Sequence, residues 1–144
     1  MPKAPGTLIA LAVAAFAAIA IVAPRHSEAA GSSVSFSAAQ VNTGEKNYQA
    51  KCSTCHGTSL EGGAGPALSG PNFQTLNSKV HAKVGDIFTY MTTNMPLNAP
   101  ASLSHDEYVS ILAFILSKNG YHPGSSPLTY SGALKSSAPI VTTK

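Results

Sequence analysis

The chain has few charged residues, only two cysteines and no tryptophan among its 144 residues. Charged residues make up 10% of the sequence, and the formal net charge is +3. A nucleic-acid-binding domain would carry a concentrated basic stripe, so this low charge argues against nucleic acid as a partner. It is compatible with docking on an acidic protein surface. The chain also lacks the second cysteine pair, or the spaced histidine pair, that a zinc site would need.

Both cysteines lie in one short motif, Cys52-Ser53-Thr54-Cys55-His56. Positions i, i+3 and i+4 share one face of a helical turn. That spacing lets two thiols bond both vinyl groups of a haem and brings an imidazole under its iron, which makes this the c-type haem attachment motif. A local disulfide or a redox-active dithiol is the alternative in an exported protein. A thioredoxin-like site would need a βαβ pattern, whereas the flanking segments have helical patterns.

The first 29 residues have the features of an export signal. Lys3 gives a basic start, residues 8–22 form an uninterrupted apolar run, and small residues stand at the two positions that a signal peptidase recognises. We expect cleavage after Ala29, so that residues 1–29 are a signal peptide. An uncleaved membrane anchor is the alternative, because the segment is just long enough to span a bilayer. Both place the remaining chain on the outer side of the membrane, where haem is attached to cysteines.

Three helices, separated by Gly- and Pro-rich loops, are predicted at about 38–52, 85–94 and 105–119. A loop at 57–72 contains the turn signals Gly-Gly and Gly-Pro, and no segment has a convincing strand pattern. Gly44 lies on the apolar face of the first helix, where glycine costs about 1 kcal/mol relative to alanine. We therefore expect a packing reason for it, such as the close approach of another helix.

Capping residues define the ends of two of these helices. Ser37 followed by Gln40, and Ser104 followed by Glu107, are capping-box signatures at the start of the first and last helices. Gly120 is a suitable residue to end the last helix. The last helix, with signals at both its start and its end, is the best defined element of the prediction.

A methionine is the candidate for a second axial ligand to the iron. Met91 falls on the apolar stripe of the second helix, and we expect it to be a core residue. Met95 precedes Pro96, and a residue before proline is pushed out of the α region. Met95 should therefore lie just past the helix end, in a stiff loop that can direct its thioether at the iron. Three histidines are alternatives for this role: His81, His105 and His122.

The segments CSTCHG, GPAL, NMPLNAP and EYVSILAFILSKNG together resemble a class I, mitochondrial-type monohaem cytochrome c. The resemblance covers about 37–120 and implies an all-α cytochrome c fold, with three to four helices wrapped around one covalently bound haem c. It implies that Cys52 and Cys55 form the thioethers and that His56 binds the iron through Nε2. The proline-rich loop after Met95 and the segment following the last helix are similar to small bacterial cytochromes c that accompany periplasmic dehydrogenases.

The resemblance also implies roles for residues outside the motif. Pro66 would offer its carbonyl to the other ring nitrogen of His56, and Leu68 would pack on the haem. Gly44 and Tyr48 would lie where the first and last helices cross, against Ile111 or Phe114 of the last helix. The absence of tryptophan departs from the family pattern, because an indole often bonds a haem propionate.

An iron held by His56 and Met95 has no open position, so the expected function is single-electron transfer without catalysis, and the protein is not expected to be an enzyme. The expected partners are a dehydrogenase or quinol-oxidising complex as donor and an oxidase or another cytochrome of a respiratory chain as acceptor. Lys51, Lys79 and Lys83 would lie near the haem edge. Two alternatives are a tightly bound cytochrome subunit of a dehydrogenase or oxidase complex, and a haem enzyme or gas sensor with a vacant iron site.

The expected organisation is a signal peptide at 1–29, a linker at 30–36, a cytochrome c domain at 37–120 and a Ser/Pro-rich tail at 121–144. A core this small needs support, and a haem fixed by two thioethers would provide it. The expected location is the periplasm, with a membrane tether if the N-terminal segment is not cleaved. The tail is either a docking segment for a partner enzyme or a partly ordered terminus.

Overall fold

The computed structural model describes residues 1–2 and 34–142. The signal peptide predicted at 1–29 therefore lies outside the described residues, apart from its first two. The helices of the described part are, in chain order, α1 (Ala38–Lys51), α2 (Ser53–His56), α3 (Gly70–Lys79), α4 (Val84–Asn94), α5 (His105–Lys118) and α6 (Tyr130–Leu134). Between 34 and 142 the only paired extended backbone is an isolated bridge between Lys83 and Pro139. The predicted all-α class is confirmed, with six helices rather than three to four.

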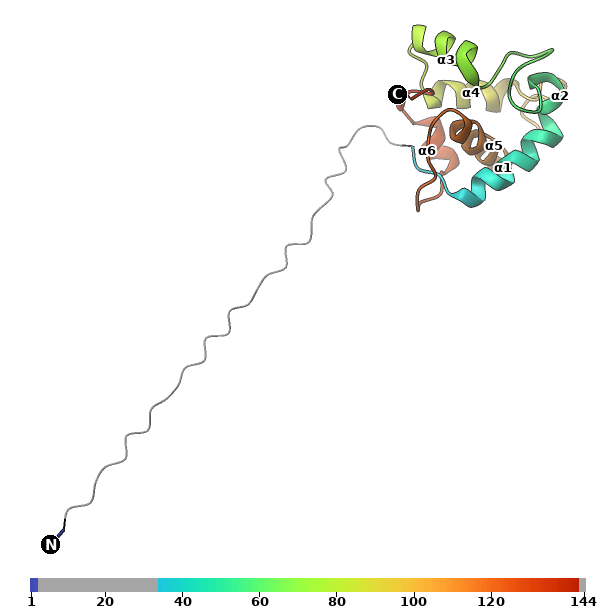
Figure 1. Ribbon diagram of the computed structural model, residues 1–144. Helices are drawn as coiled ribbons and strands as arrows, with labels where there is room; N and C mark the ends of the chain where they lie inside the picture. Colours follow the sequence, from blue (N-terminus) through green and yellow to red (C-terminus); the bar gives the residue numbers. More distant parts are fainter. Residues whose placement is uncertain (3–33, 143–144) are drawn as a thin grey trace.

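Helices α1 and α5 pack across each other and form the centre of the fold (Figure 1). Gly44 is buried at the crossing, and a β-carbon built on it would overlap the carbonyl oxygen of Ser110. One turn further along α1, the rings of Tyr48 and Phe114 pack with their centroids 5.3 Å apart. The close helix approach predicted from Gly44 is confirmed, because any larger residue there would push the two helices apart.

Both predicted capping boxes are present. The hydroxyl of Ser37 accepts from the backbone N–H of Gln40 at 3.2 Å, and the Gln40 side chain accepts from the Ser37 N–H at 3.1 Å. Ser104 and Glu107 make the equivalent pair of bonds at the start of α5. Gly120, two residues beyond α5, has φ +94°, a left-handed backbone that glycine adopts without strain. The capping signals were sufficient because each bond joins residues only three positions apart.

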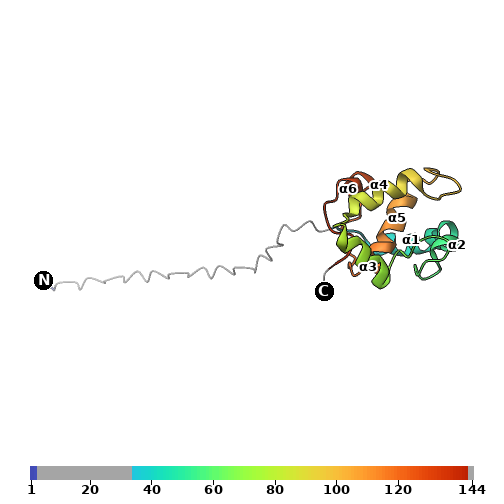
Figure 2. The same cartoon turned by 90° about the horizontal axis from the view of Figure 1, so that it is seen from above.

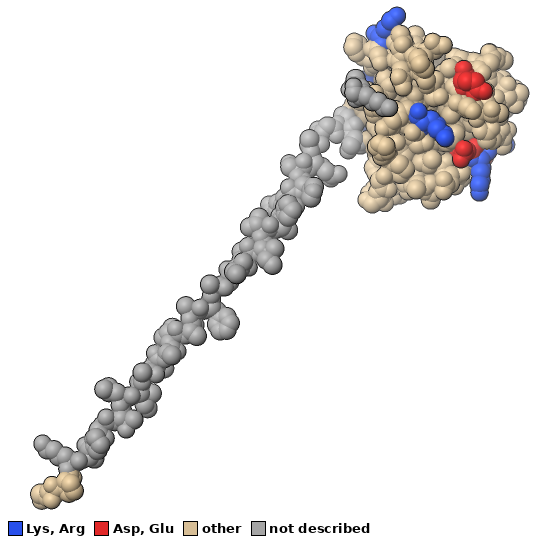
Figure 3. Space-filling model, in the orientation of Figure 1, with Lys and Arg blue, Asp and Glu red and all other residues tan. Residues whose placement is uncertain are grey.

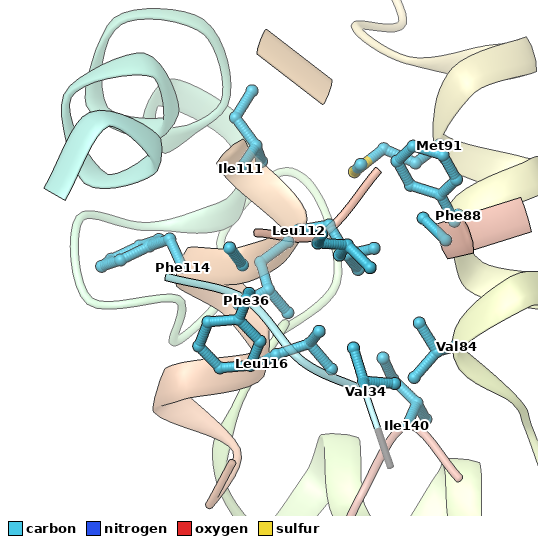
Figure 4. Packing of buried hydrophobic residues seen from close by; sticks show 14 of the residues in the cluster. Val34, Phe36, Val84, Phe88, Met91, Ile111, Leu112, Phe114, Leu116 and Ile140 are labelled. Carbon is cyan, nitrogen blue, oxygen red and sulfur yellow. The ribbon is translucent and has the colours of Figure 1, made fainter. Parts of the chain in front are cut away.

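Helix α5 is buried along 108–116 and provides the largest share of the apolar core. Figure 4 shows Leu112 of this helix directed toward Phe88 and Met91 of α4. Met91 is 9% exposed, so its predicted role as a core residue is confirmed. The core thus joins the central helix pair to α4, the helix that precedes Met95.

Helix α3 was not predicted, and the loop expected at 57–72 ends earlier than proposed because α3 begins at Gly70. As a sequence pattern, Gly70-Pro71 predicts a turn. Proline is also favoured in the first turn of a helix, where its missing N–H is not needed. Phe73, Leu76 and Val80 have the spacing of one helix face, but of these three only Phe73 is buried, and Leu76 and Val80 are 61% and 63% exposed.

The segment after α5 folds back onto the domain. It contains α6, which packs against α4 and α5, and Figures 1 and 2 both show α6 beside α4. The apolar side chains of this segment that are buried in the core are Leu128, Ala133, Ala138, Ile140 and Val141. In the described part of the chain, no helix has the length and apolar character needed to cross a membrane.

Candidate functional site

The two cysteines lie at the junction of α1 and α2. Cys52 is the residue between the two helices, and its carbonyl accepts from the N–H groups of Cys55 at 3.1 Å and His56 at 3.0 Å. These bonds form one helical turn, so the three motif side chains project from a single short segment. Cys52 is half-buried, Cys55 is exposed and both thiols are free.

The environment of Cys52 does not resemble that of a redox-active thiol. Burial, and after it the neighbouring Cys55, raises the pKa of the Cys52 thiol to about 11. Reactive dithiols have lowered pKa values, because the thiolate is the nucleophile. The raised pKa therefore argues against thiol–disulfide chemistry at Cys52, and the shared helical turn fits the attachment of a cofactor.

The imidazole of His56 is held in one orientation. Its Nδ1 donates a hydrogen bond to the carbonyl oxygen of Pro66 at 2.7 Å. The ring also lies against the backbone of Gly65, where a β-carbon would come within 2.9 Å of His56 Cε1. Since Nδ1 carries the proton, Nε2 keeps its lone pair and is free to bind a metal. The contact with Pro66 is the one that the resemblance implies, whereas the contact with Gly65 was not predicted.

The loop after His56 is fastened to the motif by backbone hydrogen bonds. Gly62 N–H donates to the carbonyl of His56 and Gly65 N–H donates to that of Cys55, both at 2.8 Å. The buried hydroxyl of Tyr48 donates to the carbonyl of Gly57 at 2.6 Å. The positions of Gly65 and Pro66 beside the imidazole therefore follow from a closed local network.

Met95 lies immediately after α4 in an extended conformation, with φ −116° and ψ 153°. This is the position predicted from Pro96. Its carbonyl oxygen accepts a hydrogen bond from the hydroxyl of Tyr108 at 2.6 Å, and its half-buried side chain packs against the core. Figures 1 and 2 both place the segment after α4 at the same end of the molecule as α2. Tyr108 was missed, because in sequence it is one apolar-face residue of α5 among several.

Leu68 is half-buried and packs against the core, and its N–H donates to the carbonyl of Leu60 at 2.8 Å. The alternative histidine ligands have other surroundings. His81 and His122 are exposed. His105 begins α5 and stacks on Tyr130 of α6, with centroids 3.6 Å apart.

The residues present fit a haem c. Two thiols on one helical turn can form thioethers, Nε2 of His56 can bind iron, and Met95 offers a thioether at a helix end. Half-buried apolar side chains, among them Leu68, are available to pack on a porphyrin. Soft sulfur and imidazole donors suit haem iron. The roles of these residues stay predictions.

Comparison with known proteins identifies the region from α1 to α5. Residues 39–115, more than half of the chain, match the family described as cytochrome c oxidase, cbb3-type, subunit III. The chain is also similar to a chain in the crystal structure of the sulfane dehydrogenase SoxCD from Paracoccus pantotrophus, with 26% identity and a TM-score of 0.52. That similarity covers 69% of this chain and 53% of the other, so the chain spans about half the length of the SoxCD chain. No curated protein matches the sequence significantly.

Proposed function

Because this chain belongs to a cytochrome c family, that of cytochrome c oxidase, cbb3-type, subunit III, we propose that it transfers single electrons by means of one covalently bound haem c. Cys52 and Cys55 would hold the group through thioethers, and His56 and Met95 would bind its iron. Haem c bound in this way supplies one-electron redox chemistry. The chain's single pair of cysteines provides for one such group.

The observation that carries the proposal is the hydrogen bond from His56 Nδ1 to Pro66 O, in a helical turn that also holds both cysteines. A histidine that binds metal through one nitrogen usually donates from the other to a carbonyl or carboxylate. Gly65 leaves room for the ring at this place, because a β-carbon there would lie 2.9 Å from His56 Cε1. His56 is therefore prepared for a ligand on its Nε2 side.

Met95 determines the kind of function. With a protein ligand on each side of the iron, no position is left for a substrate or for O₂, which favours electron transfer over catalysis. A methionine ligand also raises the reduction potential. A haem enzyme or a gas sensor would require that Met95 leave the iron.

The location and partners are part of the proposal. The N-terminal sequence favours export to the periplasm, and the similarity to a chain of the sulfane dehydrogenase SoxCD supports a redox enzyme as partner. Lys51, Lys79 and Lys83 are exposed. Lys51 lies next to Cys52 and would be on the docking face. Lys83, in contrast, precedes the start of α4, the end of that helix opposite to Met95. Figure 3 shows charged side chains scattered over one face, so we expect modest electrostatic steering that weakens as ionic strength rises.

A redox titration followed by visible spectroscopy tests the proposal, together with the mass of the denatured protein. We expect the denatured chain to keep the added mass of one haem, and a variant with Cys52→Ser and Cys55→Ser to lose it. We expect one redox transition in the holoprotein, shifted to lower potential in Met95→Ala. A colourless denatured chain without added mass would overturn the function. An unchanged spectrum and potential in Met95→Ala would overturn the axial assignment.

The second candidate is a non-dissociating cytochrome subunit of a dehydrogenase. The match to a dehydrogenase chain that is longer than this one favours it. Gel filtration of the native protein distinguishes the two candidates, because a subunit elutes with its enzyme and a free carrier elutes alone.

A further inference from the structure

The C-terminal strap, defined as residues 121–142, lies beyond the family match, which ends at residue 115. Its apolar side chains are turned into the chain's own core, and Ala133, Ala138 and Ile140 have no exposed surface. Figure 4 shows Ile140 beside Val84, the first residue of α4. These side chains are consequently not free to bind a partner enzyme, and the contacts that they make lie within this domain.

The strap caps the start of α4. The N–H of Val84 donates to the carbonyl of Ala138 at 2.8 Å, and the N–H of Gly85 donates to that of Ser136 at 3.0 Å. The first N–H groups of a helix have no partner within the helix. In α4 two of them are satisfied by carbonyl oxygens from a segment about 50 residues further along the chain.

The contact is close because α4 has a glycine there. A β-carbon on Gly85 would lie 2.7 Å from the carbonyl oxygen of Leu134 and 2.9 Å from that of Ser136. One turn further along α4, the ring of Phe88 meets Tyr130 of α6 edge-on, with centroids 5.2 Å apart. The strap and the first two turns of α4 therefore pack backbone to backbone, with an aromatic pair beside them.

We propose that the C-terminal strap positions Met95. Helix α4 has 11 residues and ends at Asn94, immediately before Met95. A continuous helix transmits the position of its start to its end, because each residue advances the axis by about 1.5 Å and all turns are hydrogen-bonded. Fixing Val84 and Gly85 therefore limits how far Met95 can move away from the iron. This inference rests on the proposed function, in which Met95 is an axial ligand.

Displacement of Met95 by imidazole in the oxidised holoprotein measures this effect. Imidazole competes with the methionine, so its apparent affinity rises with the fraction of molecules in which Met95 has left the iron. In Gly85→Ala the added methyl group meets the strap carbonyls and separates the strap from α4. We expect imidazole to bind about tenfold more tightly to this variant than to the unaltered protein. Amide hydrogen exchange of Val84 in the same holoprotein should be faster.

Two control variants separate positioning from general loss of stability. Gly124→Ala makes the same exchange within the strap, but its β-carbon meets only the side chain of Ser35. Asn47→Ala removes a hydrogen bond from α1 to Ser110 of α5, and α1 makes no contact with α4. We expect both controls to bind imidazole within about twofold of the unaltered protein. If Gly85→Ala fails to fold around haem, the milder Ile140→Val replaces it, and a smaller increase in affinity is expected.

The outcomes are distinguishable. If Met95→Ala binds imidazole tightly while Gly85→Ala behaves like the unaltered protein, the strap does not position Met95 and the inference is wrong, although the proposed function stands. An equal increase in Asn47→Ala would also overturn it, because general destabilisation would then explain the effect. If Met95→Ala binds imidazole no more tightly than the unaltered protein, the axial assignment fails, and the inference fails with it.

Discussion

The two predicted axial ligands are held in different ways. His56 bonds to Pro66, ten residues away, and rests on Gly65, so its setting is built from one short loop. Met95 bonds to Tyr108 of α5, and its helix is capped by the C-terminal strap, so its setting is assembled from distant parts of the chain. The position of His56 depends on local sequence, whereas the position of Met95 depends on the tertiary fold.

Because of this difference, the two ligands should respond differently when the fold is perturbed. A local loop closed by short-range hydrogen bonds keeps its geometry as long as the loop itself is intact. A setting made by three separate elements loosens when any one of them moves, and local opening of proteins follows such divisions. We expect perturbations of the fold to release Met95 before they release His56.

The largest effect is expected at Gly44, because the α1–α5 crossing supports both sides of the site. Gly44→Ala places a methyl group against the carbonyl of Ser110 and forces the two helices apart. Overpacking of this kind costs about 3 kcal/mol, which exceeds the gain of about 1 kcal/mol in helix propensity. The free energy of unfolding of the holoprotein in urea measures the loss.

Asn42→Ala on the exposed face of α1 is the matched control for this variant. It gains helix propensity without a clash, and its stability should stay within about 0.5 kcal/mol of the unaltered protein. A Gly44→Ala protein as stable as Asn42→Ala would mean that the helices can separate freely, and the crossing would then not be the common support of both ligands.

A pair of tyrosine variants sharpens the comparison between the two sides. Tyr108→Phe removes the hydroxyl that bonds to Met95 O, and Tyr48→Phe removes the one that bonds to Gly57 O, each at 2.6 Å. Each loss should lower stability by about 1 kcal/mol. Only Tyr108→Phe should release the methionine, so we expect imidazole to bind about fivefold more tightly to it.

The measurement is an imidazole titration of both oxidised holoproteins at one temperature and pH. Tyr48→Phe should differ from the unaltered protein by less than about twofold. Equal increases in the two variants would mean that the two ligands share one support, and the distinction between a local and an assembled side would be wrong.

The part of the site that could be predicted from the sequence is the part that depends on local contacts. The attachment motif, both capping boxes and the position of Met95 outside α4 each depend on residues within a few positions of one another. Such short-range signals are the reliable part of sequence analysis. The helical patterns and the absence of a strand pattern predicted an all-α protein, and the cytochrome c fold was what the family resemblance implied.

The elements that sequence analysis missed depend on distant contacts. Helix α3 has only two buried residues, and α6 has one. Both helices are also shorter than the window of about 11 residues over which apolar periodicity indicates a helix. The Ser- and Pro-rich composition of 121–144 indicated a tail. In the structure, Ile140 and its apolar neighbours are buried in the same core as residues of α4 and α5. The role of Tyr108 toward Met95 depends on two helices meeting, which no local pattern encodes.

The smallest effect is expected in how the stability provided by the two helix caps changes with pH, because the caps differ in chemistry. The α5 cap pairs Ser104 with a carboxylate, Glu107, whereas the α1 cap pairs Ser37 with the neutral Gln40. Hydrogen bonds from the backbone and hydroxyl of Ser104, with a smaller contribution from Lys51, hold the pKa of Glu107 below its ordinary value. A lowered pKa in the folded state stabilises the protein above the unfolded value of about 4.3, and this contribution is lost as the pH falls through the folded value.

Two cap variants compared at two pH values test this difference. Ser104→Ala and Ser37→Ala should each lower the free energy of unfolding by about 1 kcal/mol at neutral pH. On acidification below the ordinary pKa of a glutamate, the deficit of Ser104→Ala should shrink, because protonated Glu107 no longer accepts strongly from the cap. The deficit of Ser37→Ala should stay constant, because Gln40 does not titrate. Urea unfolding at each pH gives both values. Since α5 carries Tyr108, a pH-dependent deficit in Ser104→Ala alone would make the methionine side the acid-sensitive side, and parallel behaviour of the two variants would remove that distinction.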